Sequence, residues 1–162
     1  MSKDVDYKLL PLLAAKSEAE WKRFFQKNRK KMEGMDLRVH AIHHEVSERT
    51  DCLACGNCCR TLGPHITDKD VERMAKTLRI KSSEIIDKYM RIDEDGDRVF
   101  QSMPCPFLGA DNYCAIYESR PKACREYPHT DRKRFYQIYN LSIKNAYTCP
   151  IVFEVLEEIK KF

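Results

Sequence analysis

The stretch D-C-L-A-C-G-N-C-C-R, residues 51–60, decides how the rest of this sequence is interpreted. Within eight residues it carries four cysteines: Cys52, Cys55, Cys58 and Cys59. A C-x2-C step lets two sulfur atoms converge on one metal ion while backbone N–H groups point at them. Gly56 supplies a tight turn that a Cβ would obstruct. Buried apolar cysteines could account for one or two of the four, so we interpret the stretch as a metal-binding loop.

Four further cysteines follow: Cys105, Cys114, Cys124 and Cys149. The early apolar run is broken at Pro11 and makes a poor export signal, so we expect a cytoplasmic, reducing setting in which a four-disulfide framework would not persist. Eight thiolates divide into two sets of four. Adjacent side chains such as those of Cys58 and Cys59 are expected to point apart. The predicted sets are Cys52, Cys55, Cys58 and Cys149 on one centre, and Cys59, Cys105, Cys114 and Cys124 on the other.

Apolar periodicity outside the cysteine loops predicts a mainly α fold. Residues 1–48 repeat apolar side chains every three or four positions, which indicates one long helix with a break near Gly34 or two helices in sequence. Thr67 is predicted to cap a helix from Asp68 to about Leu78. The remaining predicted helices are one capped by Ser82 or Ser83 that runs to about Met90, a short one from Pro121 that carries Cys124, one over 131–146, and a terminal one from Pro150.

Irregular segments separate these helices. The pair Asp95-Gly96 between apolar flanks predicts at most one short β-hairpin. Residues 49–60 and 100–130 lack enough periodic apolar positions to fold by themselves, so something other than packing must hold them. We therefore expect a metal-organised single domain, mainly α with irregular cysteine-rich loops. In it, 1–48 form an N-terminal amphipathic helical segment, and 49–162 form a cysteine-cluster metal-binding domain with C-terminal helices, folded as one unit.

Composition narrows the class of protein. The 162 residues are 43% hydrophobic and 33% charged, with a formal net charge of +4, which fits one globular domain. This charge falls short of the clustered excess typical of a nucleic-acid binder, and the basic, aromatic segment 132–139 is usual on an amphipathic helix. No stretch approaches the ~18 to 20 apolar residues that span a bilayer. We expect neither nucleic acid nor a membrane as partner.

Three segments taken together resemble a known family. They are CLACGNCCR (52–60), CPFLGADNYCAIYESRPKACREYP (105–128) and a late C-P at 149–150. They are similar to the YkgJ-type cysteine-cluster family, whose CxxCxxCC domain is described as zinc- or iron-chelating. The resemblance includes all eight cysteine positions. It implies that the chain binds metal ions and that the ligands are Cys52, Cys55, Cys58, Cys59, Cys105, Cys114, Cys124 and Cys149.

Charge balance points to residues around such a site. Four thiolates around Zn²⁺ or a [4Fe–4S]²⁺ cluster leave a net charge of −2, which buried surroundings must offset. Arg60, Arg120 and Arg125 lie near cysteines in sequence, and each is expected to donate to a sulfur or to pair with a local carboxylate; an ordinary surface ion pair is the alternative. The histidines are expected to be ordinary structural residues, since they form no zincin motif: His40, His43, His44, His65 and His129.

Two functions follow from the eight thiolates. The first is an iron or iron–sulfur protein with a redox or electron-transfer role, which the C-x2-C-x2-C run and the late Cys149-Pro150 favour because bacterial ferredoxins use similar loops. The alternative is a zinc-organised structural domain that acts as a protein interaction module. An iron–sulfur oxidoreductase-type protein would be an enzyme, but no catalytic residue can be identified.

Overall fold

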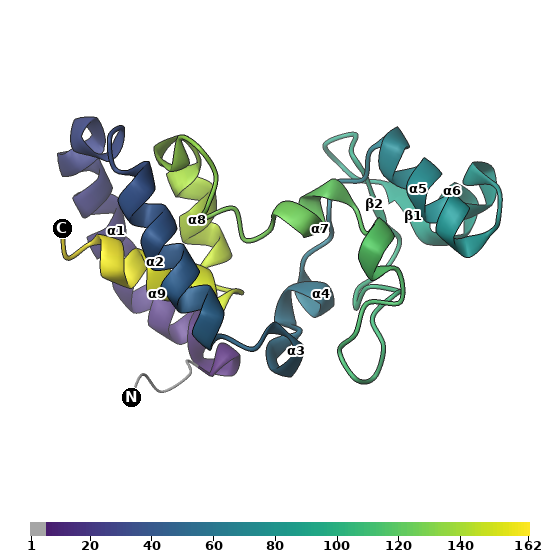
Figure 1. Cartoon of the computed structure of the whole chain (residues 1–162), viewed down its shortest axis with the longest axis horizontal. Coiled ribbons are helices and arrows are strands. Elements are labelled where there is room, and N and C mark those ends of the chain that lie inside the picture. Colours follow the sequence, from purple (N-terminus) through teal and green to yellow (C-terminus); the bar gives the residue numbers. More distant parts are fainter. Residues whose placement is uncertain (1–5) are drawn as a thin grey trace. The chain divides into compact units, whose positions relative to one another are not determined.

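The computed structural model describes residues 6–162, and helices dominate them (Figure 1). Strands β1 (Met90–Ile92) and β2 (Arg98–Phe100) form an antiparallel hairpin in which Met90 lies opposite Phe100. The fold is therefore mainly α with one short hairpin, as predicted. The described α-helices are α1 (Leu10–Met32), α2 (Asp36–Arg49), α3 (Cys52–Cys55), α4 (Asn57–Thr61), α5 (Asp68–Leu78), α6 (Ser82–Tyr89), α7 (Lys122–Glu126), α8 (Tyr139–Asn145) and α9 (Pro150–Ile159). Short 3-10 turns lie at Tyr7–Leu9, Tyr117–Ser119 and Phe135–Ile138.

The chain divides into two compact units, and the first joins its two ends: residues 6–52 with 128–162. Helices α1, α2, α8 and α9 pack together in this unit (Figure 1). Trp21 of α1 is fully buried, with its ring edge-on to Phe153 of α9 at 5.6 Å between centroids. Its indole N–H donates to a Glu157 carboxylate oxygen at 3.0 Å. Pro150 begins α9 as predicted, and the buried apolar residues of this helix close the core.

The expected break near Gly34 is present, because α1 ends at Met32 and α2 begins at Asp36. The Asp36 carboxylate accepts hydrogen bonds from the backbone N–H groups of Arg134 and Phe135 at 2.5 and 3.1 Å. Arg134 has a left-handed backbone, with φ 57°. The helix predicted over 131–146 is therefore wrong at its start. Regular α-helix begins only at Tyr139, because the anchored, left-handed turn interrupts it.

The second unit, residues 53–127, holds α3 apart from its first residue, α4 to α7, and the hairpin. Its α5 begins where predicted, since the Asp70 N–H donates to the Thr67 hydroxyl at 3.2 Å and the Thr67 N–H donates back to Asp70 at 2.8 Å. The predicted cap of α6 is wrong by one residue. Lys81 takes that place, because its own N–H is bound by the Glu84 carboxylate at 2.8 Å. The core of this unit is Ile66, Val71, Met74, Ala75, Ile85, Met90, Phe100, Phe107 and Ile116.

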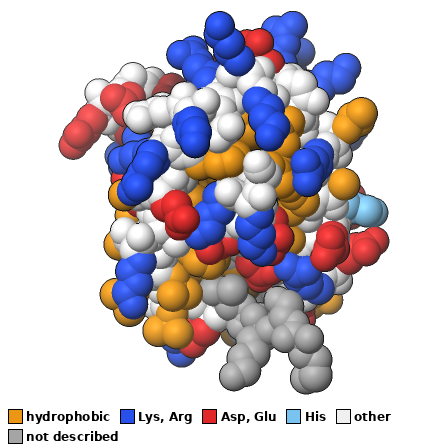
Figure 2. Space-filling view, turned by 90° about the vertical axis from the view of Figure 1, so that its left-hand side faces the viewer, with side chains coloured by type: hydrophobic (Ala, Val, Ile, Leu, Met, Phe, Trp, Pro, Cys, Tyr) orange, Lys and Arg blue, Asp and Glu red, His pale blue; other side chains and the backbone are white. Residues whose placement is uncertain are grey.

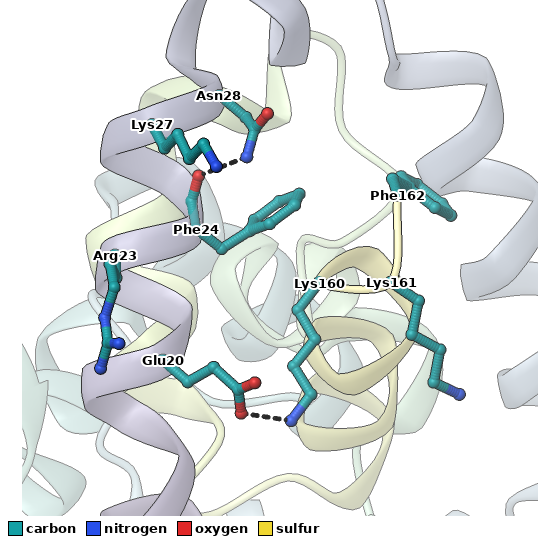
Figure 3. A pocket seen from close by; sticks show the side chains of 8 residues that line it. All are labelled: Glu20, Arg23, Phe24, Lys27, Asn28, Lys160, Lys161 and Phe162. Carbon is teal, nitrogen blue, oxygen red and sulfur yellow. Dashed lines mark hydrogen bonds and ion pairs between the residues drawn. The ribbon is translucent and has the colours of Figure 1, made fainter.

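An open hollow of about 420 Å³ lies on the first unit, between α1 and the chain end 160–162 (Figure 3). Figure 2 shows Lys and Arg side chains around apolar ones on this face of the molecule. Lys160 is bound to Glu20 at 2.7 Å and to Glu157 at 2.9 Å, and Lys161 to Glu158 at 2.7 Å. Intramolecular carboxylates thus already neutralise two of the lining cations.

No helix among residues 6–162 combines the length and the apolar character that crossing a bilayer requires.

Candidate metal centre

The eight cysteines are thiols in the structure, and they fall unevenly between the two units. Cys52, at the start of α3, is exposed, while Cys149, the residue before α9, is buried. Both belong to the first unit, whereas the second unit contains the other six: Cys55, Cys58, Cys59, Cys105, Cys114 and Cys124. The predicted set that includes Cys52 and Cys149 stays a prediction.

The Cys59 thiol has one hydrogen-bonding neighbour and two positively charged ones. The Cys58 thiol donates a hydrogen bond to its sulfur, and this bond lowers the pKa of Cys59 to about 6 against the opposing effect of burial. The guanidinium charges of Arg60 and Arg120 act in the same direction as the hydrogen bond. A lowered pKa favours the thiolate, which is the form that binds metals.

Cys105 lies against Cys59 through the backbone, because its N–H donates to the Cys59 carbonyl oxygen at 2.8 Å. Burial raises the pKa of the Cys105 thiol to about 11. The backbone N–H groups of Phe107 and Leu108 donate to its sulfur and oppose that rise. Donation of N–H groups to a cysteine sulfur stabilises the thiolate, and this is the arrangement that a C-x-x loop gives a metal ligand.

Cys114 repeats this pattern on the neighbouring segment. It forms an isolated antiparallel bridge with Leu108, and the Ile116 N–H donates to its sulfur. Burial nevertheless leaves the pKa of the Cys114 thiol raised. Both Cys105 and Cys114 pack, partly buried, against the apolar core of the unit.

Cys124 sits on α7, and burial raises the pKa of its thiol to about 12. The neighbouring thiols of Cys105, Cys59 and Cys114 act in the same direction, in that order. Like charges disfavour ionisation only when they are close, so these interactions place the four thiols within electrostatic range of one another. Cys58 and Cys55 also interact with Cys59, so the assignment of these four thiols to one centre stays a prediction.

The four thiols are near one another but are not arranged as the ligands of one metal ion. Within the described part of the chain, no three His, Cys, Asp or Glu side chains already converge on a single metal position. The donor types nevertheless suit zinc and iron, since both bind thiolate sulfur. An ion held by all four thiolates would have to draw their sulfur atoms closer together.

The vicinal pair Cys58-Cys59 differs from expectation. Neighbouring side chains on a helix leave the backbone in different directions. Here the Cys58 thiol donates to the Cys59 sulfur, so the side-chain conformations bring the two sulfur atoms side by side. The two thiols therefore interact with each other, and the assignment of Cys58 and Cys59 to different centres stays a prediction.

The three predicted arginines have different surroundings. The positive charge of Arg120 helps to lower the pKa of Cys59, and it opposes the rise that burial causes in Cys114 and Cys124, so its guanidinium lies near the thiol group. Arg60 acts on Cys59 and Cys55. Among residues 6–162, no interaction joins the Arg125 guanidinium to a cysteine.

Sequence reasoning missed a buried carboxylate that fixes the start of α7. Asp70 is fully buried, and it accepts from the backbone N–H of Lys122 at 2.9 Å and from the Arg73 guanidinium. Burial would raise the pKa of Asp70, but hydrogen bonds from Thr67 and Lys122 outweigh it and leave the pKa lowered. The capping pattern T-D-K-D signals only the local role of Asp70; nothing local signals its bond to a residue 52 positions away.

Comparison with known proteins matches the cysteine-bearing part of the chain to a family model. Residues 51–150 match the family model described as "CxxCxxCC: Putative zinc- or iron-chelating domain". The chain belongs to this family. An uncharacterized protein of Methanocaldococcus jannaschii is 33% identical over 86 residues, which cover 51% of this chain and 46% of that protein. The chain therefore aligns with about half the length of this relative. No solved structure gives a significant match.

Proposed function

We propose that Cys59, Cys105, Cys114 and Cys124 together hold one zinc or iron centre. The observation that carries the proposal is the mutual electrostatic range of these four thiols, on segments joined by the 2.8 Å hydrogen bond from Cys105 to Cys59. The family's description as zinc- or iron-chelating supports it. The nearby guanidinium of Arg120 and the backbone N–H groups of Phe107, Leu108 and Ile116 would offset the charge of the thiolates.

As the finer function, we propose an iron–sulfur centre with a redox or electron-transfer role. When bound, such a cluster supplies one-electron chemistry at a potential set by charge, N–H···S hydrogen bonds and burial. This chain's own residues supply those three influences at the thiol group. The C-x2-C-x2-C run of Cys52, Cys55 and Cys58 belongs to the other predicted set, and it supports iron over zinc for the chain as a whole, because zinc ribbons commonly use two separated C-x2-C pairs.

A zinc-organised interaction module is the second candidate. One observation favours it, because Cys105 and Cys114 pack against the apolar core. A metal ion bound there would fix the loop that carries these two cysteines to the core, as a structural zinc does. Redox activity would not be needed for such a role.

Preparation without oxygen distinguishes the two candidates. We expect brown protein that contains iron and acid-labile sulfide in near-equal amounts, measured by metal analysis and by absorption from 300 to 600 nm. Colourless anaerobic protein that holds zinc would exclude the redox role and leave the interaction module.

Single substitutions test the ligands themselves. Serine at Cys59, Cys105, Cys114 or Cys124 should lower the metal content, whereas alanine at His65 should not, since its imidazole lies beside Asp97 on the exposed surface at 3.6 Å. Unchanged metal content in two or more of the serine variants would contradict the four-thiolate assignment.

A further inference from the structure

Asn112 connects the first cysteine loop to the loop between Cys105 and Cys114. Its side-chain N–H group donates to the Leu53 carbonyl oxygen, and its side-chain oxygen accepts from the Arg60 guanidinium at 3.1 Å. Another nitrogen of Arg60 donates to the Cys55 carbonyl oxygen at 2.8 Å. The Asn112 amide and the Arg60 guanidinium thus bind two carbonyl groups of the Cys52–Cys55 turn. Asn112 lies 59 positions from Leu53 in the chain.

The backbone is adapted to this contact on both sides. Asn112 has a left-handed backbone with φ 64°, a conformation that asparagine adopts more readily than most residues. Its N–H donates to Gly109 at 3.0 Å, which closes the turn that carries it. Across from it, Gly56 has φ 54°, and a Cβ there would lie 2.6 Å from the Arg60 guanidinium and 2.9 Å from the Asn112 side chain. Gly56 is therefore needed for close approach as well as for its turn.

Resting on the proposed metal centre, we propose that Asn112 and Arg60 are positioning residues for it. They hold the segment from Leu53 to Arg60 against the loop that carries Cys105 and Cys114, so that the loops are ordered before metal arrives. Ordering the loops in advance lowers the entropy lost on binding. Residues that orient metal ligands typically change metal affinity by about 10- to 100-fold when replaced.

The amide of Asn112 is required because it donates and accepts at once. Asn112→Asp keeps an acceptor for Arg60 but places a carboxylate oxygen against the Leu53 carbonyl. Asn112→Gly keeps the left-handed backbone and removes the side chain. Arg60→Lys keeps the positive charge near the thiols and loses the two-pronged contact. The three variants remove the same contact by different chemistry.

The test is a zinc titration in competition with a chelator of known affinity, on the full chain. We expect each variant to bind Zn²⁺ about 10- to 100-fold more weakly than the parent chain. The double variant, Asn112→Asp with Arg60→Lys, should weaken Zn²⁺ binding by no more than the larger of the two single substitutions does. Absorption of the Co²⁺-loaded proteins should show unchanged thiolate-to-cobalt bands, because the ligands themselves are untouched.

Two matched controls change similar groups elsewhere. Arg79→Gly replaces another left-handed residue of the second unit, exposed and with φ 56°, and Asn140→Asp changes an exposed amide of α8. Both should bind Zn²⁺ like the parent chain. Parent-like affinity in Asn112→Asp and Arg60→Lys overturns the positioning role while the metal centre stands. A parent chain that takes up neither Zn²⁺ nor Co²⁺ overturns the proposed function, and the positioning role with it.

Discussion

His43 shows how a single residue that resembles a metal ligand can be engaged by its own unit. Its Nδ1 lies 2.6 Å from the Thr130 hydroxyl, and its Nε2 lies 3.4 Å from the Ser47 hydroxyl. Both ring nitrogens therefore face hydroxyl groups of the same unit. His40, one turn earlier on α2, contacts the Arg132 carbonyl oxygen at 3.0 Å. These imidazoles fasten α2 to the segment that follows Pro128.

A pH prediction follows from this burial. Burial lowers the pKa of His43, opposed by the charge of Asp131 and assisted by those of His40 and His44. The unfolded chain, with a histidine pKa of about 6.5, then binds the proton more readily than the folded one. The stability that neutral His43 contributes is therefore fully present above the unfolded-state pKa of about 6.5. It is lost as the pH falls through the lower pKa of the folded state.

We expect the parent chain to lose more stability than His43→Gln between pH 7 and pH 5, in urea unfolding followed by Trp21 fluorescence. Glutamine keeps a hydrogen-bonding group for Thr130 and cannot be protonated. His44→Gln, which changes a mostly exposed imidazole with 77% of its side-chain surface accessible, is the matched control and should follow the parent chain. Identical pH profiles for the parent and His43→Gln would contradict this account.

At the scale of elements, the helices of the cysteine segments are too short to stand alone. Helices α3, α4 and α7 have four or five residues and contain no buried residue. Isolated helices shorter than about 12 residues are marginal in water. Tertiary contacts must therefore hold them, and for α7 the described contact is the bond from the Lys122 N–H to the buried Asp70 of α5.

Asp70→Ala should consequently destabilise the second unit by about 3 kcal/mol, because it leaves a buried N–H group and a guanidinium without their acceptor. Hydrogen exchange of the α5 amides measures the cost, and the Lys122 amide should lose its protection. Asp68→Ala removes an exposed carboxylate that pairs with Arg98 at 2.6 Å, and should cost less than about 1 kcal/mol. An equal loss of unfolding free energy in the two variants would show that Asp70 does not hold α7.

At the scale of the whole molecule, prediction from sequence succeeded where the deciding contacts are local. Thr67 correctly predicted the start of α5, and Pro150 correctly predicted the start of α9. Asp95-Gly96 correctly predicted the hairpin. The prediction of where α8 starts was wrong, because the turn at Arg134 before this helix is held by Asp36, which lies 98 residues away in the chain. The site divides in the same way. Cysteine spacing indicated a metal centre, but no local pattern marks Asn112, whose partner Arg60 lies 52 residues away.

The two units should therefore respond differently when metal is removed. The first unit has a continuous core around Trp21 and α9, whereas residues 53–60 and 103–127 of the second depend on short elements and on the thiol group. Metal binding supplies folding free energy to such loops.

Stripping metal with a chelator from the intact chain should thus raise amide hydrogen exchange at least about tenfold across Cys105 to Cys124, while α1 and α9 keep their protection. The single tryptophan, Trp21, is fully buried in the first unit and supplies an internal control, because its fluorescence should not change. Unchanged exchange across Cys105 to Cys124 after complete metal removal would show that packing, and not metal, holds these loops. Equal loss of protection in α1 and α9 would show that metal also stabilises the first unit.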